Sequence, residues 1–267
     1  MRFDRFHPSV RYLAAIFMVA IAATACSTTH AVKPKAEVLA FDPKNIDGPW
    51  EAYPQFGAKA DPNGPPAPAR IPDPPLKAQY LPAWKAEQKK VADATAAGKP
   101  LASGYVDCLP DGMPAMMMGM FPLEVLQSKG QVTIIEEAYN QVHRIYLGEQ
   151  QMKFEDAEPY FWGHSVGHWE GNMLVANTIG IKPEVQFRNT PHSEQMSVDE
   201  RISLINASFM KDEVTVTDPV YLTAPWTWTW EYKRTPGYKI QEYVCEANRE
   251  YMDPKTGEQK MRVPKPR

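Results

Sequence analysis

The chain has 267 residues, 43% of them hydrophobic, and a formal net charge of −3 at pH 7. A slightly acidic chain lacks the basic surface that attracts nucleic acids, so we expect no nucleic-acid partner. The one long apolar segment lies at the start of the chain, and it is shorter than the roughly 20 residues that span a bilayer.

The start of the chain has the layout of a bacterial secretory signal. Three arginines precede an uninterrupted apolar stretch over residues 12–25, and Cys26 follows directly. The ending Ala-Thr-Ala-Cys resembles the lipobox, in which the cysteine after the cleavage site carries the lipid. We therefore expect residues 1–25 to be a signal peptide and the exported protein to be a lipoprotein anchored to the membrane through a palmitate-bearing Cys26. It would face the periplasm or be sorted to the outer membrane; plain secretion is the alternative.

Residues 26–82 contain prolines throughout, which is typical of an extended arm. Proline lacks a backbone N–H and fixes φ, so we expect neither a helix nor a central strand here. Trp50, Tyr53 and Phe56 indicate that part of this lipid-proximal arm packs onto the globular domain.

The globular domain is predicted to cover residues 83–267 and to begin with one helix. Residues 83–98 are rich in alanine and lysine, which favour helices, and Gly98 followed by Pro100 ends the pattern. Short β-type segments separated by turn signals follow. The predicted strands are 131–136, 141–147, 165–169, 173–178, 195–206, 213–217, 226–232 and 240–245.

About eight short strands at close spacing predict a mainly β domain, either an antiparallel barrel of the lipocalin type or a sandwich. No glycine-rich phosphate loop is visible, so nucleotide chemistry has no support. Cys108 and Cys245 remain after the lipobox, and such a pair usually forms a disulfide in an oxidising compartment. Two free thiols or a metal pair are the alternatives.

The densest group of chemically capable side chains lies within residues 162–172. The segment WGHSVGHWEGN combines two histidines, two tryptophans, a serine and a carboxylate around a Glu-Gly-Asn turn. If residues 165–169 form a strand, His164 and His168 lie on one face and Ser165 on the other.

Two further groups lie elsewhere in the chain, one around His192 and one that joins Tyr139 to His143 and Arg144. We expect five side chains to converge in the mouth of a barrel: His164, His192, Glu170, Glu200 and Arg144. A histidine with a carboxylate partner can act as an acid or a base near neutral pH.

The predicted catalytic residues are His164, His192 and Glu170. As alternatives, the histidines could bond backbone carbonyls at strand ends, or they could hold zinc, copper or iron. The nucleophile elbow G-x-S-x-G is absent, which argues against a serine hydrolase. The predicted substrate-binding residues are Tyr139, Arg144, Trp162 and Trp228.

Two apolar patterns have both a structural and a functional interpretation. The methionine-rich tract over residues 113–120 could bind Cu(I) through its thioethers, but methionine also fills cores and lines pockets. The alternating aromatic stripe Trp226–Tyr232 is typical of half of a sheet core, and the alternative is a pocket wall for a flat ligand. We expect no cofactor, with copper or zinc as the alternatives.

Several motifs resemble a large group of functionally uncharacterised, exported, β-rich bacterial proteins. They are GHSxGxWEGxxLV at residues 163–175, PHS at residues 191–193 and YxC at residues 243–245. In that group the position of His168 is usually Arg, so His164 is the better candidate of the two. The resemblance implies fold and export, and it carries no activity.

These features together predict an extracytoplasmic lipoprotein whose barrel holds a small apolar or aromatic organic molecule. Histidine acid–base chemistry would make it a lyase, an isomerase or a hydrolase. The alternatives are a non-catalytic lipoprotein that binds a ligand or scaffolds the cell envelope, and a copper-binding periplasmic protein.

Overall fold

The computed structural model describes residues 41–98, 101, 108–245, 250–253, 255–256 and 259–261. The predicted signal peptide and the predicted lipidation site therefore lie outside the described residues. Within the described ranges, no helix is long and apolar enough to cross a membrane.

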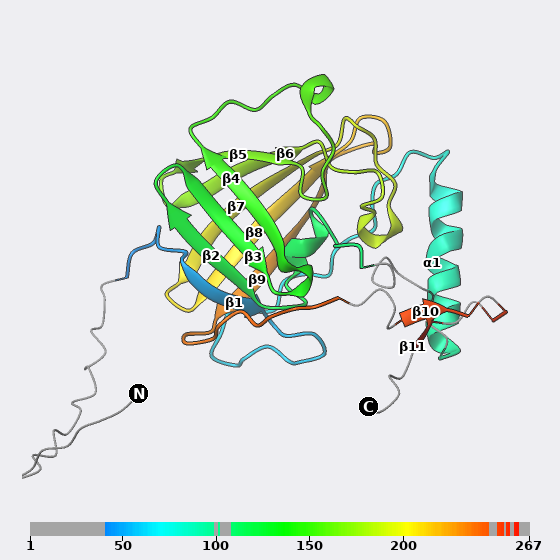
Figure 1. The fold of residues 1–267 in the computed structure, drawn as a ribbon, viewed down its shortest axis with the longest axis horizontal. Helices are drawn as coiled ribbons and strands as arrows, with labels where there is room; N and C mark the ends of the chain where they lie inside the picture. Colours follow the sequence, from blue (N-terminus) through cyan, green and yellow to red (C-terminus); the bar gives the residue numbers. More distant parts are fainter. Residues whose placement is uncertain are drawn as a thin grey trace, which may run out of the picture. The chain divides into compact units, whose positions relative to one another are not determined.

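Nine strands form a closed barrel (Figure 1). Each strand pairs with its neighbours in sequence, and the first strand pairs with the ninth to close the ring. The prediction of a mainly β barrel is confirmed, and the sandwich alternative is wrong. The strands are β1 (Gly48–Ala52), β2 (Leu123–Ser128), β3 (Gln131–Glu136), β4 (Gln141–Leu147), β5 (His164–Glu170), β6 (Met173–Ile179), β7 (Ser197–Asn206), β8 (Phe209–Thr217) and β9 (Trp226–Arg234).

One strand pair in this ring is parallel. β4 and β5 run in the same direction, with Ile145 opposite Ser165, whereas the other eight pairs are antiparallel. A ring of nine strands cannot alternate direction throughout, because an odd number leaves one neighbouring pair with the same direction. The connection over residues 148–163 must therefore cross back along the barrel, and it carries the short 3-10 helix η4 (Phe154–Asp156).

The sequence does not predict two of these strands, β1 and β2, and one predicted strand does not form. Residues 240–245 are not a strand, and β1 closes the barrel in their place. β1 tolerates Pro49 because this proline is near the start of a short strand, where a missing ladder donor costs little. The predicted boundary at residue 82 between arm and β domain is wrong, because Ile46 and Trp50 are fully buried in the core.

The predicted helix is confirmed as α1 (Leu81–Ala96), which has a proline in its first turn. Trp84 is its buried side chain, and the indole N–H donates to the Arg188 carbonyl at 3.1 Å. That carbonyl belongs to the 3-10 helix η5 (Phe187–Asn189), so α1 packs on a loop and stands apart from the strands (Figure 1).

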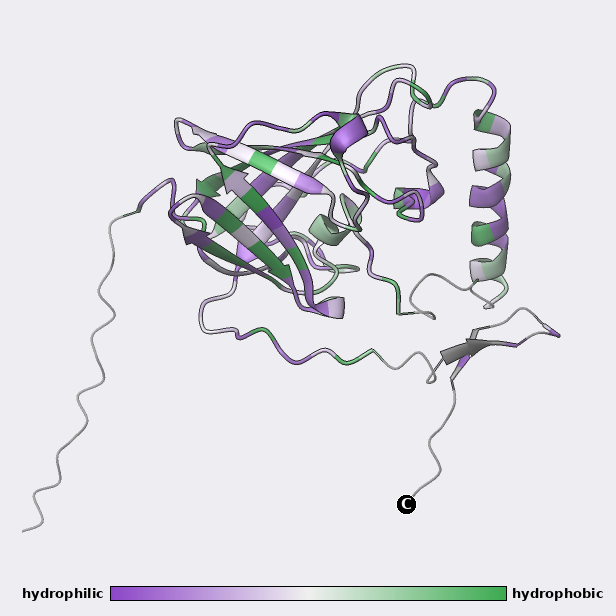
Figure 2. Cartoon of the chain, turned by 45° about the horizontal axis from the view of Figure 1, so that its top comes forward, coloured by the Kyte–Doolittle hydropathy of each residue, from purple (hydrophilic) through white to green (hydrophobic). Residues whose placement is uncertain are grey.

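Buried and exposed residues alternate along the barrel strands, and the hydropathy colours alternate with them (Figure 2). In β9 the alternation buries Trp226, Trp228, Trp230 and Tyr232, while Thr227 between them is exposed. The aromatic stripe therefore faces the barrel interior, as the sequence predicts.

The methionine tract packs into the core as part of the 3-10 helix η2 (Ala115–Met118). Met113, Met116 and Met117 are fully buried, and the hydroxyl of Tyr232 donates to the Met117 carbonyl. Core packing is thus confirmed for these three methionines. Met120, beyond η2, is 53% exposed.

Cys108 and Cys245 form the predicted disulfide, with an S–S distance of 2.07 Å. Near the bridge, the ring of Tyr243 packs 4.8 Å from that of Tyr139 and 6.1 Å from that of Phe121. These contacts fasten the segment that follows β9 to the barrel. A separate two-stranded sheet of β10 (Glu250–Met252) and β11 (Gln259–Met261) follows in the chain.

Candidate functional site inside the barrel

Strands β3 to β9 each turn at least one polar side chain inward. Each of these side chains belongs to a residue that is at most 2% exposed, and we call the set the polar core. Burying a polar group costs free energy unless it is hydrogen-bonded, so the partners of each member decide what the set can do. The members are Glu136, Gln141, His143, Ser165, Thr178, Glu200, Asp212 and Tyr232.

A short hydrogen-bond chain crosses three neighbouring strands. His143 Nε2 lies 2.9 Å from Ser165 Oγ, which lies 2.8 Å from Thr178 Oγ1. The same Nε2 lies 3.7 Å from Glu200 Oε2, and the other ring nitrogen, Nδ1, has no hydrogen-bond partner. Burial lowers the pKa of His143 to about 4, so its imidazole is neutral at pH 7.

Glu200 on β7 and Asp212 on β8 form a buried carboxyl pair. The ladder places Asp212 opposite Ile202, two residues beyond Glu200, so the two inward side chains are diagonal neighbours. Burial raises the pKa of both groups, and the charge of Asp212 adds to the rise for Glu200. For Asp212, contact with Glu200 and with the Arg201 N–H offsets part of the rise.

Apart from each other and the Arg201 N–H that contacts Asp212, the four oxygens of this pair have no hydrogen-bond donor among the described side chains and backbone groups. Two buried carboxyls in contact cannot both ionise at low cost, because desolvation and mutual repulsion oppose the second charge. The stable arrangement at neutral pH is therefore one proton shared between Glu200 and Asp212.

Glu136 is a third buried carboxyl, and it has a partner. Gln141 Nε2 donates to Glu136 Oε2, and Gln141 Oε1 accepts from the Gly112 N–H at 2.8 Å. Burial, with a smaller contribution from the charge of Asp111, raises the pKa of Glu136 to about 9. This carboxyl is therefore protonated at pH 7, and it ties the end of β3 to the segment that leads into η2.

An aromatic wall lies beside the carboxyl pair. It consists of Trp226, Trp228 and Trp230 from β9 with Phe187 from η5. Successive tryptophan centroids are 4.8 and 5.3 Å apart, and Phe187 lies 5.1 Å from Trp228. Trp230 is directly opposite Asp212 on the ladder, and Trp228 Nε1 has no hydrogen-bond partner.

A surface groove reaches this wall, and we call it the mouth groove. Its volume is about 480 Å³, and it lies between residues 51–56 and residues 118–122. Phe56 on its rim is 98% exposed, and Trp230 of the aromatic wall lines it. Trp230 therefore belongs to the lining of this groove and is also the ladder partner of Asp212.

The predicted catalytic residue His164 lies on the outer face of β5. Its Nε2 is 2.7 Å from the Glu158 carbonyl, and its ring lies 5.0 Å from that of Tyr160. Both partners belong to the β4–β5 connection, so His164 fastens that connection to the barrel. The backbone-bonding alternative describes this histidine.

Glu170 and Arg144 also point outward. Glu170 accepts a hydrogen bond from Arg201 at 2.9 Å and lies 3.2 Å from His168 Nε2, and all three side chains are substantially exposed. Arg144 is exposed because it alternates with the buried His143. The predicted convergence of these residues in the barrel mouth is wrong, since strand alternation places them on the outer surface.

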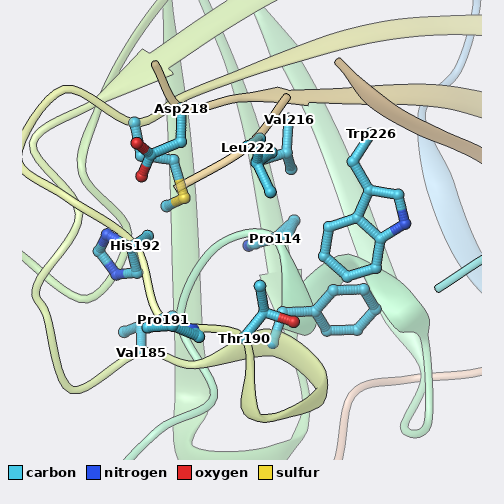
Figure 3. Close-up of a pocket in the computed structure, with 11 residues that line it drawn as sticks. Pro114, Val185, Thr190, Pro191, His192, Val216, Asp218, Leu222 and Trp226 are labelled. Carbon is cyan, nitrogen blue, oxygen red and sulfur yellow. The ribbon is translucent and has the colours of Figure 1, made fainter. Parts of the chain in front are cut away.

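His192 lines a small cavity at the barrel end near η5 (Figure 3). Its ring nitrogens lie 3.0 Å from the Lys182 carbonyl and 3.1 Å from that of Ser193, so both have partners. The cavity volume is about 20 Å³, which has room for about one water. Trp226 and Asp218 also line it, and Asp218 is already bonded to Ser193.

The predicted substrate-binding residues have separate surroundings. Trp228 is in the aromatic wall, inside the barrel. Trp162 is half-buried against the core, and its Nε1 has no partner. Tyr139 lies in the 3-10 helix η3 (Ala138–Asn140) and packs on Tyr243.

His143 and Glu200 are candidates from the sequence, but no sequence pattern pairs them, and Glu136 and Asp212 are not predicted. The signal was the strand period of two. In Met210-Lys-Asp-Glu-Val214 the residue between the two apolar positions on the buried face is Asp212. A carboxylate in phase with buried apolar residues indicates an inward acid.

None of the described histidine, cysteine, aspartate and glutamate side chains form a group of three or more arranged to hold a metal ion. Copper and zinc therefore stay predictions from the sequence.

No family model and no curated protein matches this chain. Among solved structures, a crystal structure of a mutant of the fluorescent protein UnaG matches with 16% identity and a TM-score of 0.27. The match covers 51% of this chain and 91% of that one. A likeness at this level carries no argument about function, and the fold description rests on the strand pairing itself.

Proposed function

We propose that this protein binds a small, largely apolar or aromatic organic molecule inside its barrel. The observation that carries the proposal is a buried carboxyl pair, Glu200 and Asp212, whose oxygens have no donors except each other and the Arg201 N–H. Leaving such groups unpaired costs about 1–3 kcal/mol each, and more when they are charged. A ligand that brings donors on an apolar body would remove this cost.

Other members of the polar core have side-chain or carbonyl hydrogen-bond partners outside their own pair, which distinguishes them from Glu200 and Asp212. Glu136 has Gln141, Ser165 has His143 and Thr178, and Tyr232 has a backbone carbonyl. Within the polar core and the aromatic wall, missing partners are thus concentrated at the carboxyl pair, at the adjoining His143 Nδ1 and at Trp228 Nε1. Polar groups that converge beside an apolar surface are the usual composition of a small-molecule site.

The mouth groove is the proposed entrance. Its volume of about 480 Å³ is within the range of about 300–1,000 Å³ that is typical of ligand sites. Its lining is mostly apolar, with Phe56, Met118, Met120 and Phe121 on the surface side and Trp230 on the inner side. An apolar ligand body would pass these residues before its polar end reached Asp212.

The test is a screen of the mature protein by native mass spectrometry and by tryptophan fluorescence, since the tryptophans of the aromatic wall adjoin the proposed site. We expect a bound molecule whose affinity falls at least about tenfold in Asp212→Asn and in Glu200→Gln. Glu213→Gln is the matched control, because Glu213 follows Asp212 in β8 but faces the other side of the strand. A ligand whose affinity none of these variants changes would contradict an interior site.

Acid–base catalysis on the bound molecule is a second candidate. The observation that favours it is the contrast within one site: His143 is neutral, with its pKa lowered to about 4, while burial raises the pKa of the adjoining Glu200. Neighbouring titratable groups whose pKa values are pushed apart are suited to the roles of base and acid. A lyase, an isomerase or a hydrolase would use such a pair.

Kinetics on the identified ligand would separate a catalyst from a binding protein. We expect His143→Gln to lower kcat by about 10²–10⁴-fold if the imidazole moves a proton. His164→Ala, on the outer surface, should leave kcat unchanged. Equal turnover in both variants would rule out His143 as the group that moves the proton, and a wild-type protein without turnover would be a non-catalytic binding protein.

The proposal also includes export and a lipid anchor on Cys26. The signal-type sequence and the Cys108–Cys245 disulfide support export, because disulfides persist in oxidising compartments. Metabolic labelling with a palmitate analogue should mark the wild-type chain in membranes and should not mark Cys26→Ser. Label that remains on Cys26→Ser would rule out this anchor.

A further inference from the structure

We propose that the ligand of the barrel is an organic cation, an amine whose ammonium group binds between Glu200 and Asp212 and whose apolar body lies against Trp228 and Trp230. This inference rests on the proposed function and narrows it to one ligand class. It follows from the balance of donors and acceptors, from the charges that face the pair, and from the geometry of the aromatic wall.

Acceptors outnumber donors among the unpartnered atoms. The four carboxyl oxygens of Glu200 and Asp212 are all acceptors when the pair is ionised. With its proton on Nε2, the nitrogen that faces Ser165 and Glu200, His143 adds Nδ1 as a further acceptor. Trp228 Nε1–H is the unpartnered donor beside them. An ammonium group brings three donors, whereas a carboxylate ligand would bring more acceptors.

The polar core holds no cation to balance the carboxyl pair, because at pH 7 Glu136 is protonated and His143 is neutral. In the polar core, Glu136, Glu200 and Asp212 are acids, His143 is neutral at pH 7, and Tyr232 is a phenol whose pKa burial raises. Buried residues of the described chain include no lysine and no arginine.

The side chains on the outer faces of the neighbouring strands do not supply this cation. Asp199 and Glu213 add negative potential at Glu200 and Asp212, respectively. The nearby cations are already paired, Arg201 with Glu170 at 2.9 Å and Lys211 with Glu213 at 3.1 Å. A cationic ligand would therefore supply the counter-charge that the barrel interior lacks.

The aromatic wall has the geometry that ammonium groups prefer. The rings of Trp228 and Trp230 meet edge to face at 71°, with centroids 5.3 Å apart, and so form a corner. Trp230 is directly opposite Asp212 on the ladder, which brings a carboxyl to the same place. A cation within about 6 Å of an indole face is attracted by the ring, and more so where water is excluded.

Binding of a cation has a stoichiometric consequence. The free pair holds one shared proton, and an ammonium ion in its place is best satisfied by two ionised carboxylates. The proton then leaves for the solvent, so that one ligand enters as R–NH₃⁺ and about one H⁺ is released. A neutral or anionic ligand would release none from this pair.

The experiment compares three probes that share one apolar body: 2-naphthylethylamine, the matching alcohol and the matching carboxylic acid. Each is titrated calorimetrically at pH 7 into the mature protein, in phosphate and in Tris, whose ionisation enthalpies differ. We expect the amine to bind at least about tenfold more tightly than the alcohol and the acid most weakly. Only the amine should give a binding enthalpy that depends on the buffer.

Substitutions in the carboxyl pair test whether the preference for the amine arises there. Asp212→Asn and Glu200→Gln should each abolish the preference for the amine, and Glu213→Gln should keep it. The buffer comparison on the wild-type protein needs no variant, so the inference is decided even if a core substitution prevents folding. An alcohol or acid that binds as tightly as the amine overturns the cation inference and leaves the proposed function in place. If no probe binds, the cation inference fails, and the native mass-spectrometry screen decides the proposed function separately.

Discussion

The histidine inside the barrel and the histidines outside it differ in what surrounds them. His164 Nε2 bonds a backbone carbonyl at 2.7 Å, and both ring nitrogens of His192 bond backbone carbonyls, at 3.0 and 3.1 Å. His143 faces a hydroxyl and a carboxyl, and one of its ring nitrogens has no partner. The outer histidines hold loops in place, whereas the inner one retains binding capacity that the protein itself does not use.

The carboxylates repeat the same contrast. On the outer surface, hydrogen bonds from Arg201 and His168 lower the pKa of Glu170. Inside the barrel, burial raises the pKa of Glu200 and of Glu136. Residues of the same types are thus surface ion pairs at one site and proton-bearing groups at the other, and strand alternation alone separates the two sites.

The largest expected effect comes from removing the inner histidine. His143→Ala deletes a fully buried ring and leaves Ser165 without one of its partners, so we expect a loss of about 2–4 kcal/mol in the free energy of unfolding. Urea denaturation at pH 7 measures it. His164→Ala is the control and should cost less than about 1 kcal/mol, because the ring is only partly buried. Equal losses in the two variants would remove the distinction between inner and outer histidines.

The fold was accessible from the sequence where β-forming residues are concentrated. β3 and β4 have the predicted bounds, because both segments are rich in β-branched and aromatic residues and a short turn separates them. β1 was hidden, because its proline and its position in a proline-rich segment argue against a strand. Only the barrel context, which offers β2 and β9 as partners on both sides, stabilises it.

The site was harder to predict from the sequence, because the segment with the most candidate residues presents most of its polar side chains on the outer face of the barrel. The segment around His164 is rich in histidine and tryptophan, but its polar side chains point outward except Ser165. The carboxyl pair comes from two strands and becomes a pair only when β7 and β8 align with Asp212 opposite Ile202. That register is a property of the folded barrel, which local sequence patterns do not specify.

The second prediction concerns pH. The pKa of Glu136 in the folded state, about 9, is above its ordinary value of 4.5, so between these values the folded protein holds a proton that the unfolded chain has lost. Stability should therefore fall as pH rises through this window, by about 1.4 kcal/mol per pH unit from this group. Glu136→Gln should reduce the slope between pH 7 and 8.5 by about this amount, as measured by urea denaturation, and the carboxyl pair accounts for what remains.

His143 gives the opposite slope at lower pH. Its pKa is lowered from 6.5 to about 4, so the unfolded chain binds the extra proton and the contribution of this group to stability rises with pH between these values. Between pH 4.5 and 6.5 this rise opposes the fall that Glu136 contributes. Glu170, on the outer surface, is the control for Glu136, and Glu170→Gln should leave the slope above pH 7 unchanged. A wild-type curve that is flat from pH 7 to 8.5 would show that Glu136 is ionised in the folded protein.

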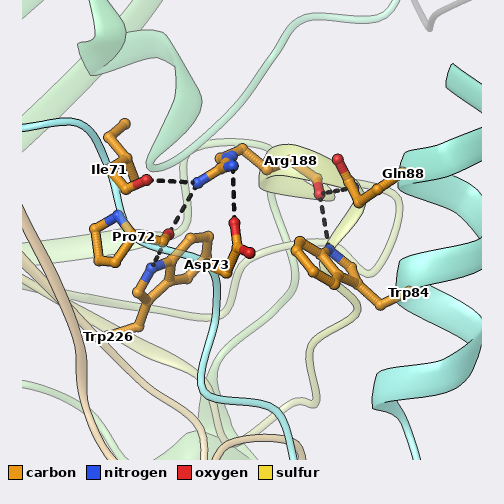
Figure 4. A network of polar contacts seen from close by, with 7 residues as sticks. All are labelled: Ile71, Pro72, Asp73, Trp84, Gln88, Arg188 and Trp226. Atoms are coloured by element: carbon orange, nitrogen blue, oxygen red, sulfur yellow. Dashed lines mark hydrogen bonds and ion pairs between the residues drawn. The ribbon is translucent and has the colours of Figure 1, made fainter. Parts of the chain in front are cut away.

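The third prediction concerns the loop that supplies Phe187 to the aromatic wall (Figure 4). The Arg188 guanidinium donates to the carbonyls of Ile71 and Pro72 at 3.0 and 2.9 Å and contacts Asp73 at 3.3 Å. Its own carbonyl accepts hydrogen bonds from two side chains of α1. Arg188→Ala should cost about 1–2 kcal/mol in unfolding free energy and should raise the exposure of the wall to a fluorescence quencher.

A matched control for this loop is Arg70→Ala, since Arg70 is exposed and lies just before the segment that Arg188 binds. It should change stability by less than about 0.5 kcal/mol and leave acrylamide quenching of tryptophan fluorescence unchanged. If the tryptophans of Arg188→Ala are quenched no more than those of the wild type, Phe187 is held over them by packing alone.

The smallest expected effect comes from a carboxylate on the outer surface, and it tests the difference between outer and inner carboxylates. Glu170→Gln weakens an exposed ion pair with Arg201, and such pairs contribute about 0–1 kcal/mol, so we expect a change within about 0.5 kcal/mol. The loss should diminish further in 0.5 M NaCl, because salt screens exposed charges. Glu200→Gln, the same change of atoms inside the barrel, should respond to salt hardly at all and should instead alter ligand binding. If the two substitutions shared one salt dependence, Glu200 would have to be in contact with solvent, and the barrel interior would not be the dry, acceptor-rich site on which both the proposed function and the cation inference depend.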